Sequence, residues 1–128
     1  MVTKQRILVV DDDSGVLEAI KIILVDSGFK VKTIISTDEF EKVMTRFKPD
    51  LVMLDIWMPK ISGEVLCRKI KEDDNLKKIP VVLLSASNRT EKISKKCKAD
   101  DYLTKPFDME ELIETVKRNL LPLPILKT

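Results

Sequence analysis

The sequence predicts a single α/β domain in which helices cover both faces of a five-stranded, doubly wound parallel sheet. Three observations support this prediction. Short apolar runs alternate with amphipathic helical stretches along the chain, and several of these runs end in an aspartate or a serine. The 128 residues suffice for one domain and leave no room for a second. Right-handed crossovers would connect the strands.

The first part of the chain predicts a strand, a helix and a second strand. Arg6–Val10 is the first apolar run and should be a strand. A helix should follow Ser14, because apolar residues recur there at helical spacing, and Gly28 is placed to end it in a left-handed conformation. Val31–Ile35 is a strand of more mixed composition.

The centre of the chain predicts a helix followed by a fully buried strand. Ser36 has the spacing of a capping box to Glu39, and the helix that follows cannot continue past Pro49. Leu51–Leu54 is apolar at every position, which indicates a strand buried on both faces, because a strand with one wet face would alternate. Asp55 lies where this strand ends.

A further helix, strand and helix are expected in the next part of the chain. The helix after Gly63 carries an apolar stripe made of Val65, Leu66 and Ile70. Val81–Leu84 is again apolar throughout and ends at Ser85. The helix over about residues 90–98 has few apolar side chains to bury, those of Ile93 and Cys97. Its hold on the core should therefore be weak.

The composition of the strands predicts their order in the sheet. The last strand, Asp101–Thr104, is mixed like the second one, and Asp108 caps a strong final helix after it. The uniformly apolar strands should lie inside the sheet and the two mixed strands at its edges. The order 2-1-3-4-5 meets this requirement with short connections. Its switch point lies between strands one and three, where ligands bind beyond the carboxyl ends of the strands.

Composition excludes several classes of function. Lys+Arg 23 against Asp+Glu 21 gives a formal charge of +2, so bulk charge gives no reason to expect nucleic-acid binding. The absence of His excludes Ser-His-Asp catalysis and imidazole-based zinc hydrolysis. No apolar run approaches a membrane span and no signal-peptide core is present, so a cytoplasmic location is expected. Cys67 and Cys97 lack metal-binding spacing and are expected to be reduced, partly buried thiols.

Carboxylates should gather at the carboxyl edge of the predicted sheet. Asp11, Asp12 and Asp13 follow the first strand, and Asp55 ends the third. Carboxylates within about 5 Å of one another repel by roughly 3 kcal/mol per pair at an effective dielectric of about 20. A compensating cation is therefore expected. Mg²⁺, or alternatively Mn²⁺, fits, since such ions take oxygen ligands from one or two carboxylates plus phosphate.

Ser85 and Lys105 end the next two strands on the same side as these carboxylates. A carboxylate, a divalent cation, an ammonium and a hydroxyl together resemble a phosphoryl-transfer apparatus, in which catalysis is mostly charge compensation and positioning. A carboxylate oxygen can act as the nucleophile and form an acyl phosphate. Lys105, the cation and the Ser85 hydroxyl can each pair with one phosphoryl oxygen.

These motifs together resemble the response-regulator receiver domain of two-component signal transduction, which has a CheY-like, flavodoxin-type fold. The motifs are Val9–Asp12, Leu54–Pro59, Leu84–Ala86 and Lys105–Phe107, in the order and spacing of that family. The resemblance covers the chain from about Lys4 to Leu120. One departure is Lys98, which stands where the family often has glycine.

The resemblance implies a metal and phosphorylation site. Asp55 would be the phosphoacceptor and Asp12 a direct Mg²⁺ ligand. Asp11 would be an acidic partner that acts largely through water, and the backbone carbonyl of Trp57 would complete the ligands that the protein supplies.

The resemblance also implies phosphoryl-contacting and switch residues. Lys105 and the backbone of Ala86 would contact the phosphoryl group, and the peptide before Pro106 would be cis. Ser85 and Tyr102 would be the switch pair, in which phosphorylation pulls the hydroxyl inward and the aromatic ring follows.

By this resemblance, the chain accepts a phosphoryl group from a histidine kinase or phosphotransfer protein. It then regulates a partner through its fourth helix, fifth strand and fifth helix, and catalyses only its own phosphorylation and dephosphorylation. The partner would be a downstream protein or an output domain missing from this sequence. The chain would be a monomer or a weak, activation-linked dimer, without membrane or direct nucleic-acid binding. Residues 1–121 would be the receiver domain and 122–128 a tail or the start of a linker.

Two other classes of function remain open. Asp11-x-Asp13 after an apolar strand also suggests an aspartate-nucleophile phosphohydrolase of the haloacid-dehalogenase type. That family needs a cap or a longer chain, and usually has Thr or Val where Gly15 stands here. A pure interaction module with the same fold would not be phosphorylated, and the intact set of acids, Ser and Lys disfavours it. A basic surface, expected to be a solvated helix face, is formed by Lys92, Lys95, Lys96 and Lys98.

Overall fold

The computed structural model describes residues 3–120, which form one parallel sheet of order β2-β1-β3-β4-β5. The strands are β1 (Arg6–Val10), β2 (Lys30–Ile34), β3 (Leu51–Asp55), β4 (Val81–Ser85) and β5 (Asp101–Thr104). The predicted strand order is confirmed, with both mixed strands at the edges. Within residues 3–120, no helix has the length and apolar character needed to cross a bilayer.

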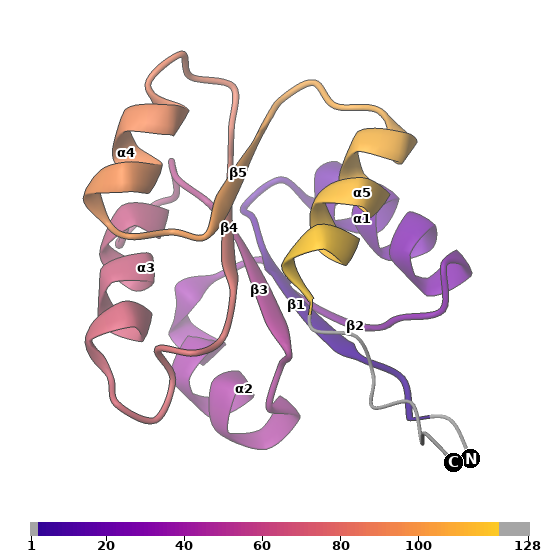
Figure 1. Ribbon diagram of the computed structural model, residues 1–128, viewed down its shortest axis with the longest axis horizontal. Helices are drawn as coiled ribbons and strands as arrows, with labels where there is room; N and C mark the ends of the chain where they lie inside the picture. Colours follow the sequence, from indigo (N-terminus) through magenta and orange to yellow (C-terminus); the bar gives the residue numbers. More distant parts are fainter. Residues whose placement is uncertain (1–2, 121–128) are drawn as a thin grey trace.

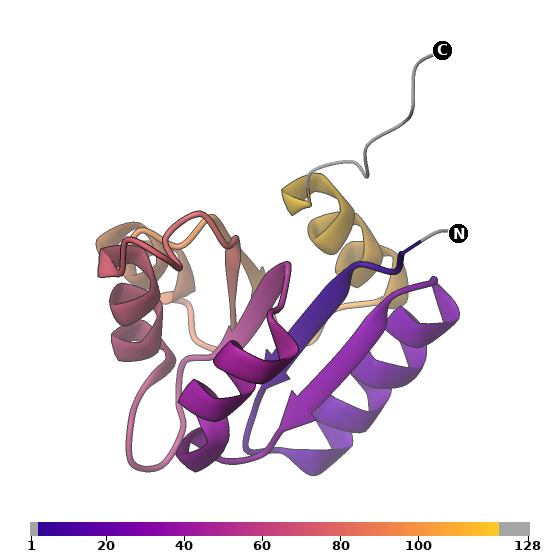
Figure 2. The same ribbon diagram turned by 90° about the horizontal axis from the view of Figure 1, so that it is seen from below.

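The helices form a layer on each side of this sheet. They are α1 (Ser14–Asp26), α2 (Phe40–Phe47), α3 (Gly63–Glu72), α4 (Thr90–Lys96) and α5 (Met109–Asn119). Figure 1 shows α1 and α5 together on one face and α2, α3 and α4 on the other. The view from below in Figure 2 shows the same two layers. The doubly wound fold predicted from the alternating pattern is therefore confirmed.

Two apolar cores lie on the two faces of the sheet, because successive side chains of a strand point to opposite faces. In β3, Val52 and Leu54 pack in the core beneath α2 and α3, and Leu51 and Met53 pack in the core beneath α1 and α5. Every residue of β3 and β4 is buried. The uniformly apolar runs thus mark the strands that are covered on both faces, as predicted.

The position of β2 differs by one residue from the predicted strand. β2 begins at Lys30, whose register partner is Arg6, and ends at Ile34. The prediction that Ile35 belongs to the strand was wrong, and its side chain is 55% exposed. Pairing with β1 explains the shift, since the Asp11 amide donates to the Ile34 carbonyl at 3.3 Å and closes the ladder there.

Two helix details also differ from the sequence pattern. The Ser36 hydroxyl accepts a hydrogen bond from the Asp38 amide at 3.2 Å, and residues 37–39 form a 3₁₀ turn before α2, so the capping box does not form. Val65, predicted on the buried stripe of α3, is 38% exposed. The buried stripe of α3 includes Cys67 instead, together with Leu66 and Ile70. Gly28 follows α1 with φ 98°, as expected.

The helix α4 has a small apolar hold on the core, as predicted. It ends at Lys96 rather than at Lys98, and Lys98 adopts a left-handed conformation with φ 64°. Its buried residues are Thr90 and Ser94, and Ile93 is only partly buried. Polar contacts complete its attachment, such as the 2.6 Å hydrogen bond that the Thr90 hydroxyl donates to a loop carbonyl. The expected domain boundary between 1–121 and 122–128 lies outside the described residues.

Candidate functional site

The predicted site residues of the strands lie at one edge of the sheet. Asp11 directly follows β1, Asp55 is the last residue of β3, Ser85 is the last residue of β4 and Lys105 directly follows β5. Parallel pairing aligns these ends, and Ser85 is in register with Thr104. Residues that are far apart in the sequence thus meet at the carboxyl edge.

Three carboxylates form a compact group at this edge. Asp11, Asp12 and Asp55 each offer one oxygen, and these oxygens lie within 4.8 Å of one another. Asp11 and Asp55 are buried, whereas Asp12 is exposed and opens the group to solvent. An all-oxygen group with an open side suits a hard divalent cation such as Mg²⁺, which retains several waters. The donor set therefore fits the expected metal.

Asp13 does not belong to this group, although it is adjacent in sequence. Its side chain caps α1 by accepting hydrogen bonds from the amides of Gly15 at 2.9 Å and Val16 at 3.2 Å. An aspartate at this position satisfies amides that have no partner within the helix. The run of aspartates is thus divided between the group of converging carboxylates and a structural role at the start of α1.

The Asp55 carboxyl is harder to ionise than an ordinary aspartate, because its pKa is raised. Burial, followed by repulsion from Asp11, raises the pKa of Asp55 to about 6. The Lys105 ammonium and the backbone amide of Trp57 act in the opposite direction. Since the net effect disfavours the ionised form, an additional cation beside Asp55 would be stabilising.

Lys105 provides the one positive charge that contacts these carboxylates among residues 3–120. Its Nζ atom lies 2.8 Å from a carboxylate oxygen of Asp11 and 3.7 Å from one of Asp55. Burial lowers the pKa of Lys105, but the hydrogen bond and charge of Asp11 outweigh it, and the pKa is raised overall. The Lys105 amide donates to the Ser85 carbonyl at 2.9 Å, and the peptide before Pro106 is cis, as expected.

The remaining predicted residues lie on β4, on β5 and in the loops after β3 and β4. The Ser85 hydroxyl is buried and accepts a hydrogen bond from the Ser87 amide at 3.0 Å, in the loop that also contains the exposed Ala86. Tyr102 is half-buried against the core beneath α4. The Trp57 side chain is 55% exposed in the loop after β3. The structure thus places the hydroxyl and the aromatic ring on neighbouring strands, β4 and β5.

Sequence reasoning missed the role of Gly63 at the start of α3. Its amide donates to the Ile56 carbonyl at 2.9 Å, so the first turn of α3 lies directly against the end of β3. A Cβ atom on Gly63 would overlap the backbone carbonyl of Asp55. A glycine immediately after the N-cap Ser62 is the only local signal of this close approach.

We expect Gly63→Ala to destabilise the protein by about 1 to 3 kcal/mol, because backbone must move to admit the methyl group. Urea denaturation measures this loss. Gly15→Ala is the matched control, since its Cβ would meet a side-chain atom of Asp13 at 3.3 Å and no backbone outside its own helix within 4 Å. Equal stability of the two variants would contradict the close approach of α3 to Asp55.

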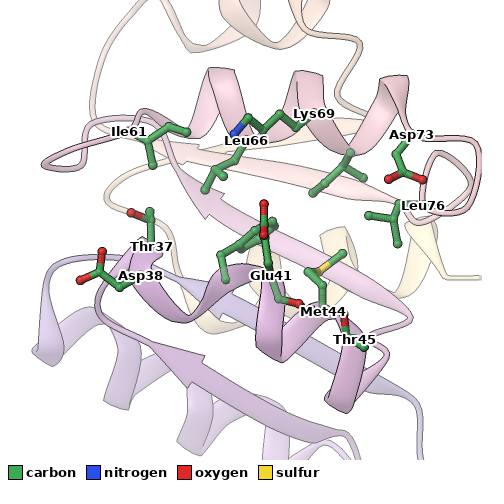
Figure 3. Close-up of a pocket in the computed structure, with 12 residues that line it drawn as sticks. Thr37, Asp38, Glu41, Met44, Thr45, Ile61, Leu66, Lys69, Asp73 and Leu76 are labelled. Carbon is green, nitrogen blue, oxygen red and sulfur yellow. Dashed lines mark hydrogen bonds between the residues drawn. The ribbon is translucent and has the colours of Figure 1, made fainter.

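A separate hollow of about 610 Å³ lies between α2 and α3. Figure 3 shows side chains of the two helices facing each other across it. Its lining includes Phe40, Glu41, Met44, Leu66, Lys69 and Ile70. None of the carboxylates at the sheet edge lines it. The charged group and this hollow are therefore separate features of the surface.

Comparison with known proteins identifies the family. The family model of the response regulator receiver domain matches residues 7–117. The chain belongs to this family. Receiver domains act generally as phosphoacceptor switches in two-component signalling, and they are not enzymes in the usual sense.

Relatives of this receiver domain include transcriptional regulators. It is 36% identical over 117 residues to the DNA-binding dual master transcriptional regulator RpaA of Synechocystis sp., covering 88% of this chain and 47% of the relative. It is 40% identical over 118 residues to the transcriptional regulatory protein PrrA of Mycobacterium bovis, covering 91% of this chain and 50% of the relative. The chain thus spans about half the length of these curated relatives.

Solved structures show the same fold along nearly the whole chain. The chemotaxis protein CheY4 of Vibrio cholerae superposes with a TM-score of 0.85 at 25% identity, covering 92% of this chain and 100% of that one. A putative response regulator from Chloroflexus aurantiacus superposes with a TM-score of 0.86 at 28% identity, covering 91% and 98%. The predicted CheY-like fold is confirmed.

Proposed function

We propose that this receiver domain accepts a phosphoryl group on Asp55 from a histidine kinase or a phosphotransfer protein. One observation carries the proposal. Oxygens of Asp11, Asp12 and Asp55 converge within 4.8 Å, and the Lys105 ammonium lies 3.7 Å from Asp55. This arrangement combines a nucleophilic oxygen, a cation site and a positive charge, which are the parts that phosphoryl transfer needs.

In the proposed reaction, a carboxylate oxygen of Asp55 attacks phosphorus while the bond from phosphorus to the donor nitrogen breaks. The product is an acyl phosphate on Asp55. Asp12, Asp55 and the Trp57 carbonyl would hold Mg²⁺ or Mn²⁺, with Asp11 acting through water. When bound, this ion supplies charge compensation to the phosphoryl oxygens. Lys105 and the backbone of Ala86 would contact the transferred group.

The proposed switch couples this chemistry to α4. A phosphoryl oxygen would accept a hydrogen bond from the buried Ser85 hydroxyl, and the half-buried Tyr102 ring would move inward with it. A hydrogen bond to a charged group contributes roughly 1.5 to 3 kcal/mol, which shifts a two-state equilibrium by about 10- to 150-fold. The small apolar hold of α4 supports its movement in response. The surface of α4, β5 and α5 would then present a changed face to the partner.

We propose that this partner is a downstream protein or an output domain outside the chain. The names of RpaA and PrrA as transcriptional regulators, and the half-length coverage of both, support an output domain. Residues 1–121 would be the receiver domain, with 122–128 as a tail or linker. The domain would act in the cytoplasm as a monomer or weak activation-linked dimer. It would catalyse only its own phosphorylation and dephosphorylation. It would not itself bind nucleic acid.

The test of this function is incubation with Mg²⁺ and phosphoramidate, followed by intact-mass measurement. We expect one added phosphoryl group that hydroxylamine removes, as it does from acyl phosphates. Steady release of phosphate from diverse monoesters would favour the phosphohydrolase. No added mass and no released phosphate would favour an interaction module.

Metal binding can be followed through Trp57, the single Trp of the chain. Because this residue lies directly beyond Asp55, we expect its fluorescence to change and saturate as Mg²⁺ is added. Asp12→Asn should weaken the apparent affinity by about 10-fold or more, since it removes a charged ligand. Asp13→Asn is the matched control, because Asn also caps helices well. Equal affinities of the two variants would contradict the assigned ligands.

A further inference from the structure

A second cluster of reactive groups lies outside the phosphorylation site, between α3 and α4. Cys67 is in α3, and Cys97 directly follows α4; their exposed fractions are 0% and 2%. The Cys67 thiol donates to the backbone carbonyl of Cys97 at 3.4 Å. The Cys97 thiol in turn donates to the Ser94 backbone carbonyl at 3.7 Å. The two residues, distant in sequence, are therefore in direct contact.

The surroundings of the pair make its two sulfurs chemically unequal. The hydrogen bond from Cys67 lowers the pKa of Cys97 to about 7 against the effect of burial, and the Ala99 amide acts in the same direction. Interaction with the Cys97 side chain, together with burial, raises the pKa of Cys67. Thiolates, not thiols, are the attacking form of cysteine. Cys97 is thus the cysteine expected to be oxidised first, because its thiolate forms more readily.

The location of the pair determines what a bond between the two sulfurs would do. Cys97 is the fully buried apolar anchor at the C-terminal end of α4, where Ile93 is only partly buried. Cys67 lies on α3, a longer helix with buried Leu66 and Ile70 beside it. A covalent bond between these residues would tie the loosely held helix to the firmly held one.

We propose that Cys67 and Cys97 form a redox modification site, at which a hydroperoxide converts the two thiols to an intramolecular disulfide that tethers α4 to α3. The Cys97 thiolate attacks the terminal oxygen of the peroxide, the O–O bond breaks, and Cys97 becomes a sulfenic acid. The Cys67 sulfur then attacks the Cys97 sulfur, expelling the hydroxyl group as water. With hydrogen peroxide, two thiols lose two electrons and two protons in total, and the peroxide becomes two water molecules.

Access for the oxidant comes from the same weak attachment of α4. Local opening of a helix with few apolar contacts requires less free energy than global unfolding. Opening exposes Cys97, and reclosing returns it to Cys67. The disulfide should then suppress further opening, so that amide hydrogen exchange in residues 90–97 slows by about 10-fold or more.

The experiment treats the reduced, unphosphorylated chain with hydrogen peroxide under native conditions. We expect loss of both free thiols, an intact mass lower by two hydrogens, and a tryptic product joining the peptide of residues 61–68 to that of 97–98. Slower amide exchange in residues 90–97, reversed by dithiothreitol, should accompany it. Cys67→Ser and Cys97→Ser are matched controls, and neither should form the intramolecular bond.

Several outcomes would overturn the proposal. They are oxidation confined to sulfinic acid, a disulfide only between two chains, or free thiols that persist while amide exchange shows that α4 opens. A disulfide that leaves the exchange of residues 90–97 unchanged would refute the tether. The decisive mass measurement is made on the wild-type chain, so poor folding of a serine variant does not affect the result. Disulfide formation does not require phosphorylation of Asp55. A chain that forms no disulfide can therefore be told apart from a chain that accepts no phosphoryl group.

Discussion

Asp55→Asn should abolish phosphoryl incorporation from phosphoramidate in Mg²⁺, a loss of about 100-fold or more that reduces labelling to background. The side-chain amide keeps the shape of the carboxyl group but lacks the anionic oxygen that attacks phosphorus. Intact-mass measurement at several times after mixing gives the rate of incorporation. Peptide mapping of the wild type should locate the acyl phosphate on the tryptic peptide that contains Asp55.

Asp13→Asn is the matched control for this loss. Asp13 is also an acid near the sheet edge, but its carboxylate accepts hydrogen bonds from amides of α1. It lies outside the group of carboxylates formed by Asp11, Asp12 and Asp55. It should therefore incorporate phosphate at close to the wild-type rate. A labile phosphoryl group that persists in Asp55→Asn would assign the nucleophile to another residue.

Asp55→Asn should also stabilise the protein when divalent cations are removed by EDTA. A shift of the Asp55 pKa from 3.8 to about 6 means that the folded state disfavours the ionised carboxylate. Each pKa unit corresponds to about 1.4 kcal/mol, and discounting for water that reaches the site leaves a gain of about 1 to 2 kcal/mol at pH 7. Thermal unfolding should show a midpoint higher by roughly 3 to 10 °C. Asp12→Asn should also raise the midpoint, and Mg²⁺ should narrow both differences.

The pH dependence of this gain has a definite sign. Since the pKa of Asp55 is raised in the folded state to about 6, the folded state binds the proton more tightly than the unfolded state. Wild-type stability should therefore decrease, relative to Asp55→Asn, as pH rises from about 4 to about 6, and the difference should level off above about pH 7. Urea denaturation across this range measures it. A difference that shrinks as pH rises would contradict the crowding of carboxylates around Asp55.

Much of the fold could be predicted because the signals are local. The apolar runs of β3 and β4 marked strands covered on both faces, and the mixed runs marked the edges. Predictions failed where contacts with another element set the outcome. Ile35 lies outside β2 because pairing with β1 ends at Ile34. Val65 faces solvent because the rotation of α3 buries Cys67 instead.

The candidate site could be predicted in its main members for a related reason. Once a parallel sheet of known order is assumed, the residues that end its strands must share one edge, which brought Asp11, Asp55 and Ser85 together in advance. Side-chain partners could not be predicted in the same way. The present ion pair of Lys105 with Asp11 depends on the direction of a flexible side chain. The close approach of Gly63 to Asp55 depends on how α3 packs.

The sequence alone determined the alternation of strands and helices, the edge at which the acids gather and the membership of the receiver family, because hydrophobic spacing and motif order are properties of neighbouring residues. Only the tertiary structure decided that Asp13 caps α1, that the Lys105 ammonium pairs with Asp11, and that Cys67 touches Cys97. These contacts depend on strand register and helix rotation. Both are set by packing between segments distant in the chain, which no local pattern encodes.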